Sequence, residues 1–447
     1  MRPQGDHEMN VAVAGGTGEE TLRTLVFADC FPPLTGGSQI ILYEIVRRFP
    51  ADVAVVCTPP VPGDEEFDRQ QPFPIIRSKT MRPLTVVWPE MPADVCQAMA
   101  REDFYCRWFR RARVMRWLVY LRVLVAMIRA ARRERAEVIF CGHPFLGGIA
   151  ARCHASMAGV PYVVYSYGEE LAMLLSRPGV ARALQRWALG GASRVFAISR
   201  FSRDVLLALG VQPDRVRVQF PAVSEVFFAQ PGLSPPEVKR RLGLAEDAPL
   251  LLTAARLMER KGVDTVIRAL PRVLEVIPAT VYLVAGSGAD EPRLRALAAQ
   301  VGVGGKVKFL GDSSHFELLN YYHACDVFVM PNREIEATGE TETFGVVFLE
   351  ANACGKPVIG GRVGGVLDAV EDGITGLLVD PTDVGAVGQA ILRLLTDPCY
   401  ARQLGENGRR RARQEFSWDR NSAEVQKALA EAVAVAKQKE RNPRLST

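Results

Sequence analysis

Residues 326–361, DVFVMPNREIEATGETETFGVVFLEANACGKPVIGG, contain the unit that decides the fold. The stretch opens with a short apolar run, VFVMP, and continues through a polar loop. Helical spacing begins near Phe344 and Gly345, and a second apolar run, KPVIGG, follows the helix. Two strands that are apolar on both faces and joined by a helix are typical of a parallel sheet covered by helices. The stretch therefore predicts an α/β fold.

The same alternation runs through the chain in two series, which predicts two doubly wound, Rossmann-like domains. A linker rich in Pro, Gly and charge, residues 229–249, lies between the series. We expect a first domain over 22–235, a second over 236–416 and a terminal helix over 417–440. The predicted strands are 24–29, 53–58, 137–142, 162–167 and 194–199, then 249–254, 280–286, 306–311, 326–331, 356–361 and 376–380.

The composition describes an ordinary globular chain. Its 447 residues are 48% hydrophobic and 23% charged, and they exceed what one core usually supports. No apolar run reaches the roughly 20 residues that a membrane-spanning helix needs. Residues 1–21 make a poor secretory signal, so we expect a disordered leader there. The nine cysteines form no CxxC pair, which favours reduced thiols in a cytoplasmic protein over a disulfide framework or a zinc site.

Positive charge is concentrated in one segment. From Arg107 to Arg135 there are ten arginines and one acidic residue, Glu134, while the whole chain has a net charge of only +5. Such concentration argues against nucleic-acid binding, where a broad basic groove is expected. The segment fits one long helix with an arginine stripe and apolar residues over much of the remainder. Two interpretations stay open: a solvated helix packed on its own sheet, or a helix lying on an anionic membrane.

Two cations follow the first strand of the second series, in PLLLTAARLMERKGVD (residues 249–264). Ligands of open α/β sheets bind beyond the carboxyl ends of the strands. The planar guanidinium of Arg256 can donate two parallel hydrogen bonds, and the ammonium group of Lys261 is a charge on a flexible side chain. Together they suit a diphosphate. The alternative is that both are surface charges on a loop. Gly286 ends the next strand in the sequence VAGSG, which lacks the third glycine of a dinucleotide fingerprint.

Two carboxylates flank the helix that begins near Gly345. Glu342 precedes the helix and can accept hydrogen bonds from sugar hydroxyls, and Glu350 lies eight positions further on. Gly345 lets a ligand approach the backbone where the free amides of the first helical turn point. The layout matches a nucleotide sugar: amides for the phosphates, one carboxylate for the sugar and one for the ribose.

These motifs together resemble family 4 of the retaining glycosyltransferases. The resemblance rests on the Glu342–Glu350 spacing, EANACGKPVIGGRVGGVLDAV, DGITGLLVDPTD and the pair Arg256 and Lys261, and it covers residues 24–418. The sequence ETFGVVFLEANACG is most similar to that of bacterial phosphatidylinositol mannosyltransferase-like members. The resemblance implies the GT-B fold, in which two domains face each other across a cleft and a C-terminal helix crosses back to the first domain.

The resemblance also assigns residues to roles. Arg256 and Lys261 would hold the diphosphate, Glu342 the sugar hydroxyls, and Glu350 the ribose. His143 would contact the sugar's primary hydroxyl. The alternative is a structural histidine at a strand end whose hydrogen-bond partners all belong to the protein. Donor contacts would further include Gly36, Gly37, Gly286, Phe344, Gly345 and Val346, and the acceptor side would include Tyr167 and Gly168. The last two stand where many members have a His-Gly pair, so the acceptor site departs from the family pattern.

The expected function is transfer of a hexose from a nucleoside diphosphate sugar, with GDP-mannose favoured, to a lipid or lipid-linked glycan. No metal or other cofactor is expected, because cations and helix amides replace the metal. We expect a cytoplasmic protein, which lies on the inner face of the plasma membrane if the arginine-rich helix binds a membrane. A soluble small acceptor is the alternative. A nucleotide-binding oxidoreductase would need a glycine fingerprint after the first strand, whereas AGGTGEE precedes it. A non-catalytic binding module is disfavoured because the charged residues of the family site are all present: Arg256, Lys261, Glu342 and Glu350.

Overall fold

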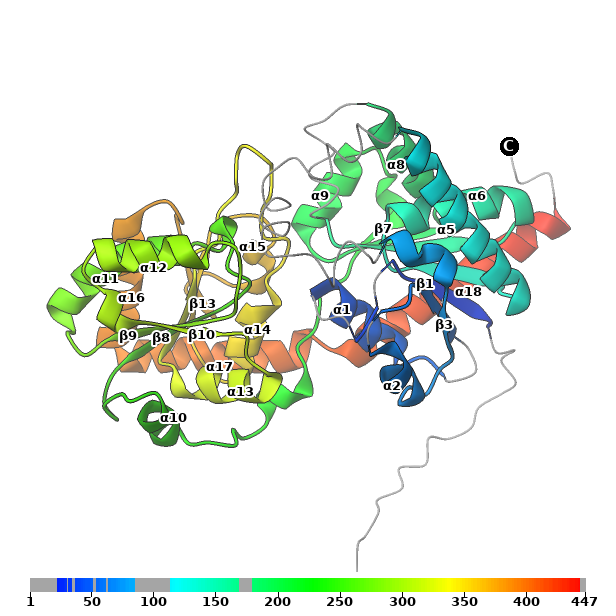
Figure 1. Cartoon of the computed structure of the whole chain (residues 1–447). Helices are drawn as coiled ribbons and strands as arrows, with labels where there is room; N and C mark the ends of the chain where they lie inside the picture. The colour runs from blue at the N-terminus through cyan, green and yellow to red at the C-terminus, as the bar shows by residue number, and fades with distance from the viewer. Residues whose placement is uncertain are drawn as a thin grey trace, which may run out of the picture.

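The computed structural model describes residues 22–29, 31–33, 37–50, 54–61, 63–84, 113–168 and 179–442. These residues form two lobes, each built on one parallel sheet with helices against its faces (Figure 1). The predicted α/β class with two doubly wound sheets is confirmed. The predicted leader and Gly36 lie outside the described residues, and so does the part of the arginine-rich segment before Arg113.

The first lobe has a seven-stranded sheet in the order β3-β2-β1-β4-β5-β6-β7. Its strands are β1 (Thr24–Phe27), β2 (Ala54–Thr58), β3 (Ile75–Arg77), β4 (Val138–Cys141), β5 (Tyr162–Ser166), β6 (Arg194–Ala197) and β7 (Val216–Val218). Its helices are α1 (Gly37–Val46), α2 (Asp64–Arg69), α5 (Arg113–Arg133), α6 (Leu146–Ala158), α8 (Val180–Gly190) and α9 (Arg200–Ala208), with shorter 3₁₀ turns η1 (Lys79–Leu84), η2 (Pro213–Arg215) and η3 (Glu225–Phe228).

The second lobe has a six-stranded sheet in the order β10-β9-β8-β11-β12-β13. Its strands are β8 (Leu250–Ala254), β9 (Val281–Ala285), β10 (Val307–Gly311), β11 (Val327–Met330), β12 (Val358–Gly361) and β13 (Gly376–Val379). Its helices and turns are α10 (Pro235–Arg241), η4 (Glu259–Lys261), α11 (Val263–Val276), α12 (Glu291–Gln300), η5 (Gly304–Lys306), α13 (His315–Ala324), α14 (Val346–Ala353), α15 (Val366–Ala369), α16 (Val384–Thr396) and α17 (Pro398–Glu415).

The central strands form because they are apolar throughout. Every residue of β1, β4, β5, β8 and β9 is buried, as expected for parallel strands covered on both faces. The sequence analysis missed β3 and β7. Both are three-residue strands at the two edges of the first sheet, and each contains an arginine and lacks a fully buried residue. Short, half-exposed edge strands lack the continuous apolar run on which the predictions relied.

The strand order reverses once in each sheet, and these reversals position the site. In the first lobe β1 lies between β2 and β4, and in the second β8 lies between β9 and β11. At such a switch point the two flanking loops leave in opposite directions and open a crevice at the carboxyl ends of the strands. The loops after β1, β4, β8 and β11 therefore carry the residues that a bound ligand would meet.

The last helix, α18 (Trp418–Arg441), crosses back and packs against α1, β4 and β5 of the first lobe, as Figure 1 shows in red. Phe220, just before η3, stacks on Phe344 of the second lobe at 5.7 Å between ring centroids. Asp368 of α15 accepts a hydrogen bond of 2.6 Å from the backbone N–H of Arg200, the first residue of α9, and its other oxygen lies 3.2 Å from Nε of Arg200. The two lobes thus contact each other through apolar and charged groups.

Candidate active site

The switch point of the second lobe brings together the loops after β8 and β11. The loop after β8 forms the short turn η4, which ends at Lys261, and Gly262 follows with φ +70°. A side chain at Gly262 would overlap the carbonyl of Pro331, the residue directly after β11, so only glycine permits this approach. The same contact places Arg260 and Lys261 beside the segment from Asn332 to Glu342.

Glu342 is the centre of a buried polar cluster. Its side chain is only 10% exposed, and its Oε2 accepts hydrogen bonds from Nζ of Lys261 and, at 3.0 Å, from Nδ2 of Asn332. Nη1 of Arg260 lies 3.7 Å from the same oxygen and donates to the carbonyl of Thr341 at 3.3 Å. The contacts of Lys261, Asn332 and Arg260 with the Glu342 side chain are all to Oε2. Among the described residues, no hydrogen bond reaches Oε1, which leaves that atom for a ligand.

The cluster keeps Glu342 ionised. Burial by itself raises the pKa of this carboxyl, but the charges of Lys261 and Arg260 and the hydrogen bonds from Lys261 and Asn332 oppose it. The net pKa of Glu342 lies below its usual value. A carboxylate in this state accepts hydrogen bonds and carries no proton at neutral pH.

Glycines hold the Glu342 segment against its neighbours. The backbone N–H of Gly365 donates to the carbonyl of Glu342 at 2.8 Å, and side chains at Gly364 or Gly365 would overlap the backbone of Glu342 or Thr343. Gly345 has φ +88°, and a Cβ there would come 2.7 Å from the ring of Phe348. The helix α14 begins directly after it, at Val346, as the spacing predicts. Its first free amides therefore lie next to Glu342.

Glu350 is set on α14 in a different environment. Its Oε2 accepts a hydrogen bond of 2.8 Å from the hydroxyl of Tyr322, a fully buried residue of α13. Burial raises the pKa of Glu350 to about 7, although the Tyr322 hydrogen bond lowers it. The two carboxyl groups thus differ in what sets their pKa. Cations surround Glu342, whereas Glu350 has one neutral hydrogen-bond donor.

The two cations that the sequence analysis paired differ in their surroundings. Lys261 is 13% exposed and engaged by Glu342, while Arg256 is exposed and makes no hydrogen bond or ion pair with the described residues. Gly286, at the end of β9, packs so closely on Ala255 that a side chain would overlap the Ala255 carbonyl. The loop that carries Arg256 therefore lies against the turn after β9.

The first-lobe residues gather at the other switch point. His143 follows β4, and its Nδ1 lies 3.5 Å from a carboxylate oxygen of Asp29, which follows β1. The His143 ring is 6.3 Å from that of Tyr167, whose hydroxyl donates to the carbonyl of Ser38 at 3.0 Å. Ser38 is the second residue of α1, next to Gly37. His143, Tyr167 and Gly37 thus belong to one neighbourhood, and Gly168 packs against Ser202 with φ +89°.

Four residues of these clusters were not singled out from the sequence: Asp29, Arg260, Tyr322 and Asn332. Asp29 and Asn332 come directly after strands, where the rule that located Lys261 and His143 also applies. Arg260 is adjacent to Lys261, but the sequence does not show which cation of the turn faces inward. Tyr322 had no signal, because an apolar helix position gives no sign that its hydroxyl meets a carboxylate.

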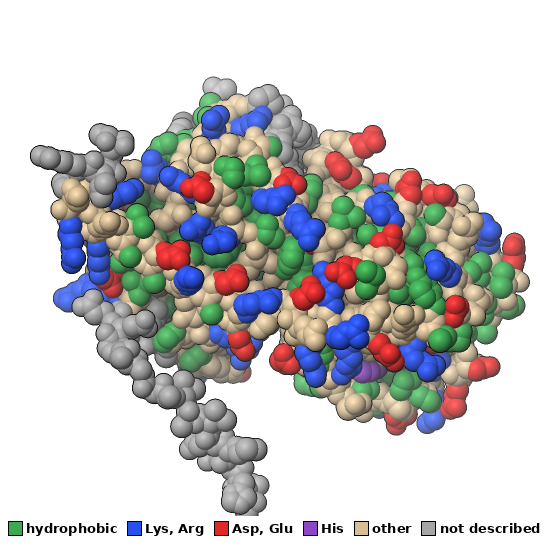
Figure 2. Space-filling view, turned by 180° about the vertical axis from the view of Figure 1, so that it is seen from behind, with side chains coloured by type: hydrophobic (Ala, Val, Ile, Leu, Met, Phe, Trp, Pro, Cys, Tyr) green, Lys and Arg blue, Asp and Glu red, His purple; other side chains and the backbone are tan. Residues whose placement is uncertain are grey.

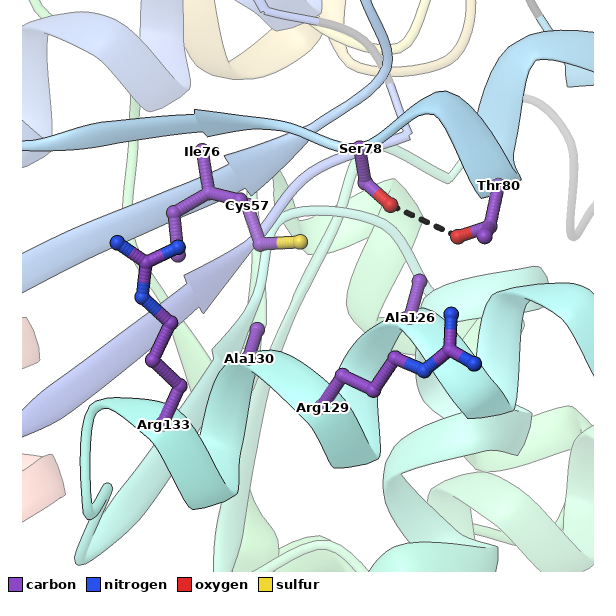
Figure 3. Close-up of a pocket in the computed structure, with 8 residues that line it drawn as sticks. All are labelled: Cys57, Ile76, Ser78, Thr80, Ala126, Arg129, Ala130 and Arg133. Atoms are coloured by element: carbon purple, nitrogen blue, oxygen red, sulfur yellow. Dashed lines mark hydrogen bonds between the residues drawn. The ribbon is translucent and has the colours of Figure 1, made fainter.

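One cavity lies away from these clusters, in the first lobe. It has a volume of about 180 Å³ and lies between α5 and the strands β2 and β3 (Figure 3). Arg129 and Arg133 of α5 border it, and Ser78 and Thr80 line it with hydroxyls that share a hydrogen bond of 2.8 Å. In the part of the chain that the structure describes, no group of three or more His, Cys, Asp or Glu side chains is placed to hold a metal ion.

Comparison with known proteins gives two family matches and full-length relatives. Residues 35–225 match the family "Glycosyltransferase Family 4" and residues 235–411 match "Glycosyl transferases group 1". The GDP-mannose-dependent alpha-(1-6)-phosphatidylinositol monomannoside mannosyltransferase of Mycolicibacterium smegmatis is 30% identical over 91% of this chain and 98% of its own length. The D-inositol 3-phosphate glycosyltransferase of Acidothermus cellulolyticus is 36% identical over 70% and 73%.

Solved structures share the fold. Anabaena HepE in complex with UDP has a TM-score of 0.71 at 18% identity and covers 92% of this chain and 100% of its own. The sucrose-phosphate synthase of Thermosynechococcus elongatus has a TM-score of 0.72 at 23% identity, covering 92% and 100%. The predicted GT-B arrangement of the two lobes is confirmed.

Proposed function

The chain belongs to family 4 of the retaining glycosyltransferases, and on this basis we propose that it transfers mannose from GDP-mannose to a lipid-linked acceptor. As a member of this family it is a hexosyltransferase. The identity of donor and acceptor is the proposed part. The observation that carries it is the full-length similarity to a relative whose name specifies GDP-mannose and a phosphatidylinositol mannoside, together with the Glu342 cluster at the start of α14.

The donor occupies the second lobe in this proposal. The ammonium group of Lys261 has three N–H donors, and its bond to Glu342 uses one, so two remain for the diphosphate. Arg256, which is exposed and without a partner among the described residues, can turn onto the same phosphates. Oε1 of Glu342 accepts from the sugar hydroxyls, and Glu350 accepts from the ribose. The amides of Phe344, Gly345 and Val346 face the phosphates and sugar.

The reaction exchanges one bond of the anomeric carbon for another. The bond from this carbon to the diphosphate oxygen breaks, and a bond to the acceptor hydroxyl oxygen forms on the same face of the sugar. The acceptor proton passes to the departing phosphate. Lys261 and Arg256 stabilise the negative charge that develops on the diphosphate. Glu342 positions the sugar and forms no covalent bond, and the chemistry is proposed to need no metal.

We propose that the acceptor binds at the first lobe near Tyr167 and Gly168, that His143 contacts the donor sugar there, and that α5 brings this lobe to a membrane. Among the α5 residues whose burial the structure describes, the buried ones are Val123, Ala126, Met127, Ala130 and Ala131. Its exposed side carries Arg122, Arg129, Arg132 and Arg133 beside Leu121, which is 55% exposed. A row of arginines beside an apolar edge suits anionic headgroups and the acyl chains beneath them.

Neighbouring helices extend this surface. α6 packs against both α5 and α8, and large apolar side chains are exposed on them: Met157 of α6, and Val180 and Trp187 of α8. By contrast, the face seen in Figure 2 carries basic and acidic side chains interspersed over both lobes. No helix in the described part of the chain is both long and apolar enough to span a bilayer. We therefore propose peripheral binding to an anionic inner leaflet.

A soluble acceptor is the second candidate. The similarity to a D-inositol 3-phosphate glycosyltransferase over 70% of this chain favours it. The two candidates share donor chemistry and differ only at the first lobe. Incubation with GDP-mannose and either phosphatidylinositol monomannoside or inositol 3-phosphate, followed by mass spectrometry of the product, distinguishes them. Mannosylation of the soluble acceptor alone would contradict the lipid proposal.

The donor assignment is tested first by thermal unfolding with GDP, UDP or ADP. A ligand at one hundred times its dissociation constant adds about 2.7 kcal/mol to the free energy of unfolding. We expect GDP to raise the melting temperature most.

Glu342→Ala is expected to abolish transfer while the protein still binds GDP, because this carboxylate is assigned to the sugar. Turnover near that of the unchanged protein would remove the assigned role.

A further inference from the structure

Glu350 is supported by a residue that cannot itself reach a ligand. Tyr322 is completely buried, and its hydroxyl donates to Oε2 of Glu350 at 2.8 Å. Among the described residues this is the only hydrogen bond to the Glu350 carboxylate, so Oε1 has no such partner. A carboxylate has lone pairs for several hydrogen bonds. One oxygen is therefore held by the protein and the other is left to accept from a bound molecule.

The Tyr322 ring is held rigidly behind Glu350. It packs edge-to-face on Phe227 at 5.6 Å between centroids, and it contacts Phe328 of β11 at 5.7 Å. Phe227 belongs to η3, in the segment between the two sheets, and its carbonyl accepts a hydrogen bond of 3.3 Å from the thiol of Cys354, the residue after α14. A ring enclosed by two buried aromatic residues cannot swing away, so its hydroxyl fixes the direction of the Glu350 carboxylate.

We propose that Tyr322 is a positioning residue that orients Glu350 toward the two ribose hydroxyls of the nucleotide. The inference rests on the proposed function, because the ribose is assigned to Glu350 there. The added claim is that the preference for a ribose with both hydroxyls depends on Tyr322, a buried residue of a different helix. Without the hydroxyl of Tyr322, the carboxylate can rotate and loses its one hydrogen-bond donor.

The same contact affects the charge of Glu350. Burial raises the pKa of Glu350 to about 7 and the Tyr322 hydrogen bond lowers it, so removing the hydroxyl raises this pKa further. The ionisable groups around this contact include the thiols of Cys325 and Cys354, which stay neutral because burial raises their pKa, and the cations Lys356 and Arg409, which act on the Cys354 thiol. His323, next to Tyr322, has its pKa lowered by burial and by the same two cations. None of these replaces the lost donor.

The experiment compares GDP with 2′,3′-dideoxy-GDP by isothermal titration calorimetry. Both ligands are titrated into the unchanged protein, Tyr322→Phe and Tyr321→Phe at pH 8. Tyr321 is the matched control, because it is the neighbouring, half-buried tyrosine and makes no hydrogen bond to Glu350. We expect the unchanged protein and Tyr321→Phe to prefer GDP. Tyr322→Phe should weaken GDP binding roughly tenfold and leave dideoxy-GDP binding nearly unchanged, as for loss of one hydrogen bond to a charged group.

Several results overturn the inference. Equal weakening of both ligands in Tyr322→Phe would indicate general damage, and an unchanged preference for GDP would show that the tyrosine has no such role. Equal affinity of the unchanged protein for both ligands would remove Glu350 from the ribose while the nucleotide site stands. Failure of the unchanged protein to bind GDP, UDP or ADP would instead remove the proposed function, and this inference with it.

A second measurement needs no variant. In the unchanged protein, the preference for GDP over dideoxy-GDP should decline as the pH falls through about 7, because protonation of Glu350 weakens it as an acceptor. In Tyr322→Phe, if it folds, the decline should begin at a higher pH. A preference that stays constant between pH 6 and pH 8 overturns the inference even if the variant cannot be purified.

Discussion

Glu342 is a mostly buried carboxylate that accepts hydrogen bonds from Lys261 and Asn332 and lies 3.7 Å from the guanidinium of Arg260. Removing one partner from such a buried pair leaves an uncompensated charge, which costs much more than the pair contributes as a whole. This asymmetry makes Lys261 important in two ways: it keeps Glu342 ionised, and it offers its remaining N–H groups to a ligand.

We expect Lys261→Ala to lower the free energy of unfolding by roughly 3 kcal/mol, because Glu342 loses its closest charge. Urea denaturation measures this loss. GDP affinity, measured by calorimetry, should fall as well. Lys437→Ala is the control, since it breaks an exposed ion pair with Glu137, for which we expect less than about 1 kcal/mol. A loss in Lys261→Ala no larger than in the control would contradict the buried pair.

Glu350 should make the protein less stable as the pH rises. The pKa of Glu350 is raised to about 7 in the folded state, from an ordinary value of 4.5, so the folded protein retains a proton that the unfolded chain releases. The stabilisation is fully present below pH 4.5 and is lost as the pH rises through 7, by up to about 3 kcal/mol. Glu350→Gln should remove this dependence. Urea denaturation at pH 5 and pH 8 checks it, and equal pH dependence in both proteins would refute the prediction.

At the scale of elements, α5 shows how packing selects one face of a helix. The sequence pattern placed arginines on one stripe and apolar residues over the remainder, but it did not say which apolar residues face the sheet. Among the α5 residues whose burial the structure describes, Val123, Ala126, Met127, Ala130 and Ala131 are buried in the core of the first lobe. Leu121 is consequently left exposed beside Arg122. The spacing explains which residues are buried, because side chains three or four positions apart lie on the same face of a helix.

The triple variant Arg122→Glu, Arg129→Glu, Arg133→Glu should lose binding to vesicles that contain an anionic lipid. Each arginine at such a surface contributes about 1 kcal/mol, so the affinity should fall more than about a hundredfold. Vesicle flotation measures it. The matched control reverses Arg402, Arg410 and Arg420, which are exposed on α17 and α18, and so has the same net charge. If neither the unchanged protein nor the control binds, or if all three bind equally, the membrane proposal is wrong.

The strands illustrate the limits of pattern analysis in the same way. Eleven were expected from continuous apolar runs, and each has a counterpart in the structure. The two that were missed, β3 and β7, lie at the sheet edges, where one side is unpaired and burial is incomplete. Their strand conformation comes from pairing with β2 and β6 rather than from their own residues.

At the scale of the whole molecule, Asp368 couples the lobes to the site. Its side chain is 3% exposed and contacts the start of α9 in the first lobe. Its own helix, α15, begins after Gly365, whose N–H bonds the carbonyl of Glu342. Movement of one lobe relative to the other therefore acts on a segment that is hydrogen-bonded to the Glu342 backbone.

We expect Asp368→Ala to let the lobes separate. The backbone N–H of Arg200 loses its acceptor, and small-angle scattering should give a larger radius of gyration. Asp419→Ala serves as the control, because Asp419 also pairs with a first-lobe arginine, Arg48, but is 87% exposed. An unchanged radius in Asp368→Ala, or an equal increase in the control, would show that this contact does not hold the lobes together.

The sequence by itself determined the alternation of strands and helices, the family, and the positions of Lys261, Glu342 and Glu350, because periodicity and motif spacing are local properties of the chain. The tertiary structure alone decided which partners these residues have. Lys261 and Glu342 are 81 residues apart, and Tyr322 and Glu350 are 28 apart. Lys261 and Glu342 meet because the order of the parallel strands brings their loops to one edge of the sheet, and Tyr322 and Glu350 meet because the fold brings α13 and α14 together. No local pattern encodes either arrangement.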